Sequence, residues 1–182
     1  MGNIFHGERV RLRGVEESDF EHYFAWEQDT DGSRMDYEIW FPTSTTSRRE
    51  WVQSQARVTG EGDIFRFTIA TLDDVVVGSL NTHTVNRRNG TFSYGFFIDA
   101  NHRRKGYASD ALRILFRYFF HERGYQKVNA EVFAFNEPSM RMHEHFGFTL
   151  EGRLRRMIFT QGQHHDALIY GMTREEFETK HL

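Results

Sequence analysis

The chain has 182 residues, a formal net charge of −3 and 38% hydrophobic content, which predicts a single domain over residues 1–182 with one core. It contains no Cys, which excludes thiolate catalysis, disulfides and Cys-ligated metal sites. The small acidic excess argues against a dedicated nucleic-acid binder. No apolar run reaches the roughly 20 residues of a membrane span, and the first residues lack the apolar stretch of a secretory signal. We therefore expect a cytoplasmic protein that does not enter a membrane.

The first third of the chain predicts one strand and two helices. Alternation of apolar and basic residues over 9–13 predicts a half-buried strand. Ser18 with Glu21, and Ser47 with Glu50, have the spacing of capping boxes and predict the starts of two helices. The acidic stretch 27–32 between them is expected to form a loop.

Turn residues and alternation then predict three strands, over residues 63–70, 75–84 and 91–98. The remaining patterns predict, in order, a helix from Ala108 to Gly124, a strand over 127–135, a short helix from an Asn136 cap to Gly147, and strands around 153–160 and 167–172. This order favours a mixed α/β (α+β) fold with a largely antiparallel sheet.

The most informative segment runs from the aromatic strand 91–98 through a basic loop into the next helix. Arg103, Arg104 and Lys105 precede Gly106 at the expected helix start. Backbone N–H groups at a helix N-terminus attract anions, and glycine permits close approach. The pattern is neither a Walker A loop nor G-x-G-x-x-G. It predicts a pyrophosphate cradle, with an ordinary charged turn as the alternative.

Two motifs resemble those of the GCN5-related N-acetyltransferase (GNAT) family. Arg103-x-x-Gly106-x-Ala108 resembles the family's acetyl-coenzyme A loop, and Asn136-x-x-Ser139 followed by Gly147-Phe148 resembles its second motif. Further positions match the branch of ribosomal-protein and spermidine N-acetyltransferases: Leu12, Arg13, Asp19, Trp26, Glu151, Gly152, Arg153, Leu154, Arg155, Gly162 and Asp166.

The resemblance implies a sheet that splays between its fourth and fifth strands, with helices on its faces. It implies acetyl-CoA as co-substrate and no metal. Pantetheine would pair with the backbone of the fourth strand, and the pyrophosphate would bind the loop and the first turn of the helix. The cofactor-binding residues implied are Phe96, Phe97, Ile98, Arg103, Arg104, Lys105, Gly106, Tyr107, Ala108, Asn136 and Ser139.

The sequence departs from the family at both proton-handling positions. Ser93 stands where many relatives have a Glu base, and His143 stands where relatives often have a Tyr acid. A histidine with an unperturbed pKa near 6.5 could protonate the leaving thiolate; the alternative is a packed or surface helical histidine. Glu131 could replace the base or be a solvent-facing carboxylate, and water could relay the proton.

The acceptor residues implied are Trp26, Glu27, Tyr37, Glu38 and Ser93. Carboxylates beside aromatic faces suit a cationic amine, although an acidic stretch can equally be solvated surface. We therefore expect an N-acetyltransferase that transfers acetyl to a primary amine (a polyamine, a protein N-terminus or a small molecule) in a ternary complex, with homodimerisation left open. The alternatives are a non-catalytic acyl-CoA-binding protein and a ribosome- or RNA-associated module.

Overall fold

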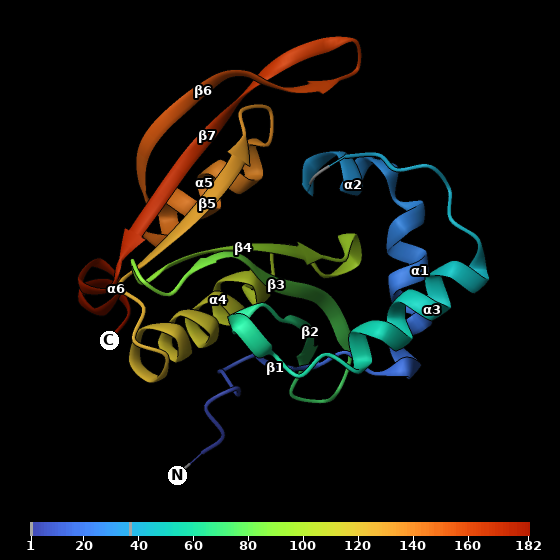
Figure 1. Ribbon diagram of the computed structural model, residues 1–182, viewed down its shortest axis with the longest axis horizontal. Helices are drawn as coiled ribbons and strands as arrows, with labels where there is room; N and C mark the ends of the chain where they lie inside the picture. The colour runs from blue at the N-terminus through green and yellow to red at the C-terminus, as the bar shows by residue number, and fades with distance from the viewer. Residues whose placement is uncertain (1, 37) are drawn as a thin grey trace. The chain divides into compact units, whose positions relative to one another are not determined.

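The computed structural model describes residues 2–36 and 38–182 (Figure 1). The strands pair in the order β1-β2-β3-β4-β5-β7-β6. Their bounds are β1 Val10–Gly14, β2 Arg66–Thr71, β3 Val76–Asn86, β4 Thr91–Ile98, β5 Lys127–Phe133, β6 Thr149–Thr160 and β7 Gln163–Thr173. The helices are α1 Phe20–Gln28, α2 Thr30–Asp36, α3 Thr45–Ala56, α4 Tyr107–Arg117, α5 Glu137–Phe146 and α6 Arg174–His181.

The sheet is mixed and mostly antiparallel. β4 and β5 run parallel, with pairing from Thr91 to Ser93 on β4. The β1–β2, β2–β3, β5–β7 and β6–β7 pairs are antiparallel. Together with the flanking helices, this confirms the predicted fold class.

The chain forms two compact units. The first comprises the chain up to His83 together with 95–114, and the second comprises 84–94 together with 115–182. The expectations of a single domain and of a splay between β4 and β5 stay predictions.

A small apolar cluster holds α1 and α3 together in the first unit. It contains buried Val15, Phe20, Tyr23 and Val52, with partly buried Phe24, Trp26 and Trp51 packed against it. Tyr23 contacts both tryptophans edge-on, with ring centroids 5.0 and 5.4 Å away. Burial of these rings is the main force that folds two short helices onto each other.

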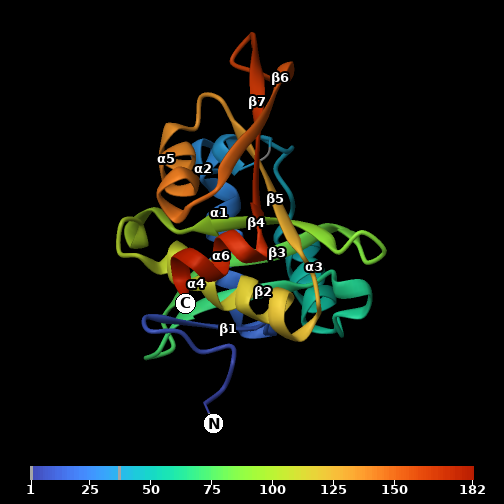
Figure 2. The same ribbon diagram turned by 90° about the vertical axis from the view of Figure 1, so that its left-hand side faces the viewer.

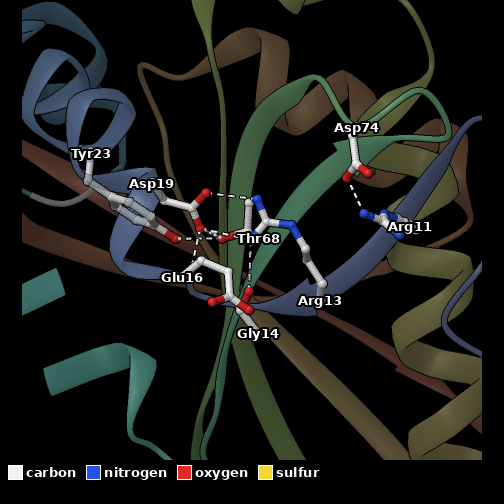
Figure 3. A network of polar contacts seen from close by, with 8 residues as sticks. All are labelled: Arg11, Arg13, Gly14, Glu16, Asp19, Tyr23, Thr68 and Asp74. Carbon is white, nitrogen blue, oxygen red and sulfur yellow. Dashed lines mark hydrogen bonds and ion pairs between the residues drawn. The ribbon is translucent and has the colours of Figure 1, made fainter. Parts of the chain in front are cut away.

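A buried polar network fixes the start of α1 to the sheet (Figure 3). Asp19 is 2% exposed and accepts two hydrogen bonds from the Arg13 guanidinium, at 2.8 and 2.7 Å. It also accepts from the Glu16 backbone N–H and the Thr68 hydroxyl, both at 2.9 Å. Burial alone would raise the pKa of Asp19, but these hydrogen bonds outweigh it and lower the pKa.

The second unit has an aromatic core. Phe92 on β4 stacks on Phe119 at 4.3 Å, and Phe116 contacts Phe177 of α6. α5 lies on one side of β5 and β7, as both views show (Figures 1 and 2). The Tyr170 hydroxyl on β7 donates to Glu144 on α5 at 3.0 Å, which ties this helix to the sheet.

Several expected boundaries are corrected by the structure. The capping box before α1 joins Glu16 and Asp19, ahead of a 3-10 turn, so Ser18 does not cap the helix. The N-cap of α3 is Ser44, which accepts from the Ser47 backbone, so Ser47 lies inside the helix. The acidic stretch 27–32 is mostly helical, because α1 ends at Gln28 and α2 begins at Thr30.

Candidate active site

The basic loop of the first unit has an unusual backbone between β4 and α4. Arg104 and Gly106 have φ of +61° and +80°, the left-handed region that glycine tolerates best. The Asp110 N–H donates to the Gly106 carbonyl at 3.1 Å, so α4 starts directly after this glycine. The first N–H groups of the helix have no acceptor within it and carry its positive dipole end.

A hollow of about 430 Å³ opens at this helix start. Its lining includes the predicted Arg104, Lys105 and Gly106, and also residues that sequence reasoning missed: Glu8, Arg9, Ser109 and Arg113. The lining therefore contains four cationic side chains and one carboxylate, and Arg113 also lies 3.9 Å from the buried carboxylate of Asp110. That balance suits a dianionic group such as a pyrophosphate diester.

Asp110 explains why Arg9 lies beside the loop. Its carboxylate is buried and accepts from the backbone N–H groups of Glu8, Arg9 and Val10, at 3.3, 2.8 and 3.0 Å. These bonds fix the chain before β1 against α4. The Arg9 guanidinium can then donate to the Lys105 carbonyl at 3.5 Å.

The fit of coenzyme A to this loop can be judged from Gly106. A Cβ there would meet the Arg9 side chain at 3.4 Å, which is ordinary contact, so glycine is required by its φ rather than by crowding. The backbone with positive φ angles, the first N–H groups of α4 and four cationic side chains lie together at one hollow. The residues present therefore fit the pyrophosphate of coenzyme A.

The other predicted cofactor residues of the first unit lie on β4 and at its end. Tyr107 and Ala108 form the first turn of α4. Ile98 is buried, and its carbonyl accepts from the Arg103 Nε at 3.0 Å. The Arg103 guanidinium lies 5.9 Å from the Phe97 ring centroid, so Arg103 follows the end of the strand instead of lining the hollow. Phe96 lies between Gly95 and Phe97 on the same strand.

In the second unit, His143 is engaged at both ring nitrogens. Nδ1 lies 2.8 Å from the Ser139 carbonyl, which can only accept, so Nδ1 carries the proton. Nε2 then accepts from the Tyr94 hydroxyl at 2.8 Å. The ring is 2% exposed and stacks on Tyr170, and burial lowers the pKa of His143 to about 4.

We expect His143 to stay neutral across the working pH range, because protonation would place an unsolvated charge in this aromatic pocket. The resonances of its ring in an NMR titration should not move between pH 8 and 5.5. Its protonation would favour the unfolded state, so stability should fall as pH drops from 6.5 towards 4. A His143 titration near pH 6.5 would contradict this and favour the predicted acid role.

The predicted acid role of His143 can also be tested kinetically, by substituting this residue. If His143 protonates the thiolate, His143→Phe should lower kcat about ten-fold or more at similar cofactor affinity, and His143→Tyr should retain much of the activity. If His143 only packs, the loss in the Phe variant should follow its loss of stability. Thermal unfolding measured alongside kcat separates the two.

The remaining predicted residues of the second unit have identifiable local roles. Asn136 caps α5 by accepting from the Ser139 backbone N–H at 3.2 Å, as its position predicted. Ser93 pairs with Asn129 on β5. Glu131 is exposed on β5 opposite Ile169. Their contacts to coenzyme A or acceptor stay predictions.

The predicted acceptor residue Glu27 forms an ion pair that the sequence did not reveal. The Glu27 carboxylate accepts from Arg48 Nε at 2.5 Å and from the Thr43 hydroxyl at 2.6 Å. Partial burial would raise the pKa of Glu27, but these bonds lower it. Glu38 is exposed, and Tyr37 lies outside the described residues. Glu27 is therefore already neutralised by a cation of the chain itself.

Two further observations concern the described part of the chain. Among these residues, no group of three or more His, Asp or Glu side chains is placed to hold a metal ion. None of their helices has both the length and the apolar character to cross a membrane.

Comparison with known proteins shows the class to which this fold belongs. The family model described as an acetyltransferase (GNAT) domain matches residues 9–149. The chain belongs to the GNAT family and is an N-acetyltransferase.

Relatives extend over most of the chain. It is 41% identical over 175 residues to the SPbeta prophage-derived uncharacterized N-acetyltransferase YokL of Bacillus subtilis (strain 168), covering 96% of both chains. It is 29% identical to the putative ribosomal N-acetyltransferase YdaF of the same organism, over 58% of each. Its fold resembles a spermidine N-acetyltransferase from Vibrio cholerae in complex with CoA and spermine, with a TM-score of 0.80, 18% identity and coverage of 93% and 98%.

Proposed function

We propose that this protein transfers the acetyl group of acetyl-CoA to a primary amine by direct attack in a ternary complex. The observation that carries the proposal is the basic hollow at the start of α4, where Arg104, Lys105 and Gly106 meet Arg9 and Arg113. Family membership supports acetyl transfer as the reaction. The chain has no Cys, so no acetyl-cysteine intermediate can form.

The residues of the chain mainly bind and orient the reactants. Backbone N–H groups from Arg104 to Ala108 would hold the pyrophosphate, and Arg9, Lys105 and Arg113 would neutralise its charge. Acetyl-CoA supplies the activated acetyl group as a thioester. Holding the amine beside this group removes the entropic cost of their encounter, which can account for most of the acceleration.

Proton transfer in this reaction requires few side chains. The amine must be deprotonated before it attacks. Ser93 pairs with Asn129 on the neighbouring strand and Glu131 is exposed, so neither position identifies a base. We propose that water removes the proton. The rate should then rise with pH as the free-amine fraction of the acceptor grows.

The proposed acceptor is a primary amine of a small molecule or a peptide, whatever the net charge of that acceptor. The spermidine N-acetyltransferase neighbour and the putative ribosomal relative make a polyamine and a protein N-terminus the first two candidates. The Arg48–Glu27 ion pair removes one carboxylate from the predicted polycation site. Exposed Glu38 remains available to a cation.

Charge reversal at Glu38 tests the polycation hypothesis without breaking an observed ion pair. Glu38→Lys should raise KM for spermidine several-fold more than KM for a monoamine, because repulsion grows with acceptor charge. Glu21→Lys, an exposed charge reversal on α1, is the matched control. Equal changes for both acceptors would show that Glu38 is ordinary surface.

The experiment that tests the function is a panel of acceptors scored by release of free coenzyme A thiol. Polyamines, peptides with free N-termini, amino sugars and amino acids should be compared at fixed acetyl-CoA. We expect intersecting lines in double-reciprocal plots for the active acceptor, as for a ternary complex. Parallel lines would indicate a covalent acetyl-enzyme and contradict direct attack.

A further inference from the structure

The indole of Trp26 connects α1 to the end of β4 within the first unit. Its Nε1–H donates to an Asp99 carboxylate oxygen at 2.9 Å. The other oxygen of Asp99 accepts from the Asn101 backbone N–H at 2.8 Å. This one carboxylate thus holds both α1 and the turn that leads to the basic loop.

These two hydrogen bonds stabilise the charged form of the Asp99 carboxylate. Partial burial would raise the pKa of Asp99, but the bonds from Asn101 and Trp26 outweigh it, and the pKa is lowered. An ionised acceptor makes the indole bond stronger than a neutral one would be. The connection is therefore a defined polar contact rather than incidental packing.

A second connection joins the α1–α2 corner to the same loop. The Asp29 carboxylate caps α2 by accepting from the Gly32 N–H at 2.9 Å, and lies 3.9 Å from the Arg103 guanidinium. A Cβ at Gly32 would stand 2.6 Å from Asp29 and 3.2 Å from the Phe97 ring, so α2 approaches β4 as closely as glycine allows. Trp26 packs on the same ring, with centroids 5.3 Å apart.

We infer that Trp26 and Asp29 are positioning residues that couple the acceptor segment, α1 and α2, to the cofactor loop through Asp99 and Arg103. Coenzyme A binding would thereby order the acceptor segment before the amine arrives. The inference rests on the proposed function, because it takes the basic loop as the cofactor site. It also changes the predicted role of Trp26, whose indole N–H is used inside the protein and not by the substrate.

The physical basis is the position of Arg103 in the chain. It directly precedes Arg104, whose φ of +61° begins the left-handed stretch of the loop. A ligand that fixes this backbone also fixes Arg103 and thereby its contact with Asp29. Coupling of this kind is reciprocal, so whatever orders α2 should also tighten cofactor binding.

Hydrogen exchange measured by mass spectrometry, with and without saturating coenzyme A, tests this coupling. In the unaltered protein we expect slower exchange in loop 103–109 and, by about five-fold or more, in α2. Trp26→Phe keeps a ring against Tyr23 and Phe97 but removes the N–H donor. It should keep protection of the loop and lose most of that in α2.

Trp51→Phe is the matched control, because Trp51 packs on the same Tyr23, whereas the hydrogen bond to Asp99 is donated by Trp26. Asp29→Asn is a second variant, which weakens the attraction to Arg103 and can still cap α2. The folding of all three variants should be checked by circular dichroism and thermal unfolding.

The outcomes separate the two proposals. If coenzyme A leaves loop 103–109 unprotected in the unaltered protein, the proposed function fails. If the loop is protected but α2 exchanges equally with and without coenzyme A, the coupling does not exist. Full α2 protection in folded Trp26→Phe and Asp29→Asn variants would also overturn the inference.

Discussion

Replacing Gly106 with Val should reduce the affinity for coenzyme A by about 100-fold or more. Gly106 has a φ of +80°, which costs an L-residue roughly 1–2 kcal/mol and more when the side chain is β-branched. The chain would escape this strain by rotating the backbone, which would turn the N–H groups at the start of α4 away from the pyrophosphate. Isothermal titration calorimetry measures the loss directly.

Gly162→Val is the control for the backbone penalty. Gly162 has a φ of +74° in the turn between β6 and β7, with open space where a Cβ would stand. The Gly162→Val variant should have a similar backbone strain and should bind coenzyme A with unchanged affinity. Unchanged affinity in a folded Gly106→Val variant would remove this loop from the cofactor site.

Replacing Asp19 with Ala should lower the free energy of unfolding by about 3 kcal/mol, which is a large part of a domain's stability. The change leaves the Arg13 guanidinium, whose side chain is 22% exposed, without its bidentate partner (Figure 3). It also removes the acceptor for the Glu16 N–H and the Thr68 hydroxyl. Urea denaturation followed by circular dichroism measures the effect.

Two comparisons make the Asp19 prediction specific. Adding Arg13→Met to Asp19→Ala should restore part of the loss, because it removes the unpaired charge. Asp74→Asn weakens the more exposed ion pair with Arg11 and should change stability by less than about 0.5 kcal/mol. A cost for Asp19→Ala as small as that of Asp74→Asn would show that the network contributes little.

The same carboxylate predicts a pH dependence. The pKa of Asp19 is lowered in the folded protein, so its stabilisation is complete above the pKa of the unfolded chain and is lost as pH falls through the folded value. The Asp19→Ala variant should therefore lose less stability on acidification than the unaltered protein. Denaturation midpoints compared at pH 7 and at about pH 2.5, below the pKa of an unfolded Asp, test this sign.

Local sequence patterns predicted the elements whose ends are set by neighbouring turn or cap residues. β4 spans Thr91–Ile98 as predicted, since a turn at Asn89-Gly90 and alternation along the strand fix both ends. α5 begins after the Asn136 cap and ends at Gly147, whose φ of +111° only glycine adopts readily. The start of α4 after Gly106 was likewise predictable, because glycine readily adopts the φ of +80° found there.

Long-range contacts explain what the sequence did not reveal. Arg9 reaches the loop because buried Asp110, a hundred residues away, binds the backbone before β1. Ser109 and Arg113 could have been found, since both follow Gly106 at helical spacing on one face. The cap of α1 is set by Asp19, whose geometry depends on Arg13 and Thr68, and no local pattern contains that information.

The burial of His143 also depends on tertiary structure. Tyr94, Phe148 and Tyr170 come from three different strands or turns and enclose the ring, with centroids 5.1 to 6.1 Å away. A helical histidine on the surface would have the same sequence neighbours. Only the packed structure shows that its Nδ1 proton is held by the Ser139 carbonyl.

The most direct test of the proposed function follows a labelled acetyl group from acetyl-CoA to the acceptor. The protein is incubated with deuterated acetyl-CoA and the most active amine of the panel, and mass spectrometry of the amine is compared with free-thiol release. We predict one labelled acetylated amine for each thiol released, with turnover lost in Gly106→Val and retained in Gly162→Val. Thiol release without labelled amine, or full turnover in Gly106→Val, would contradict the proposal.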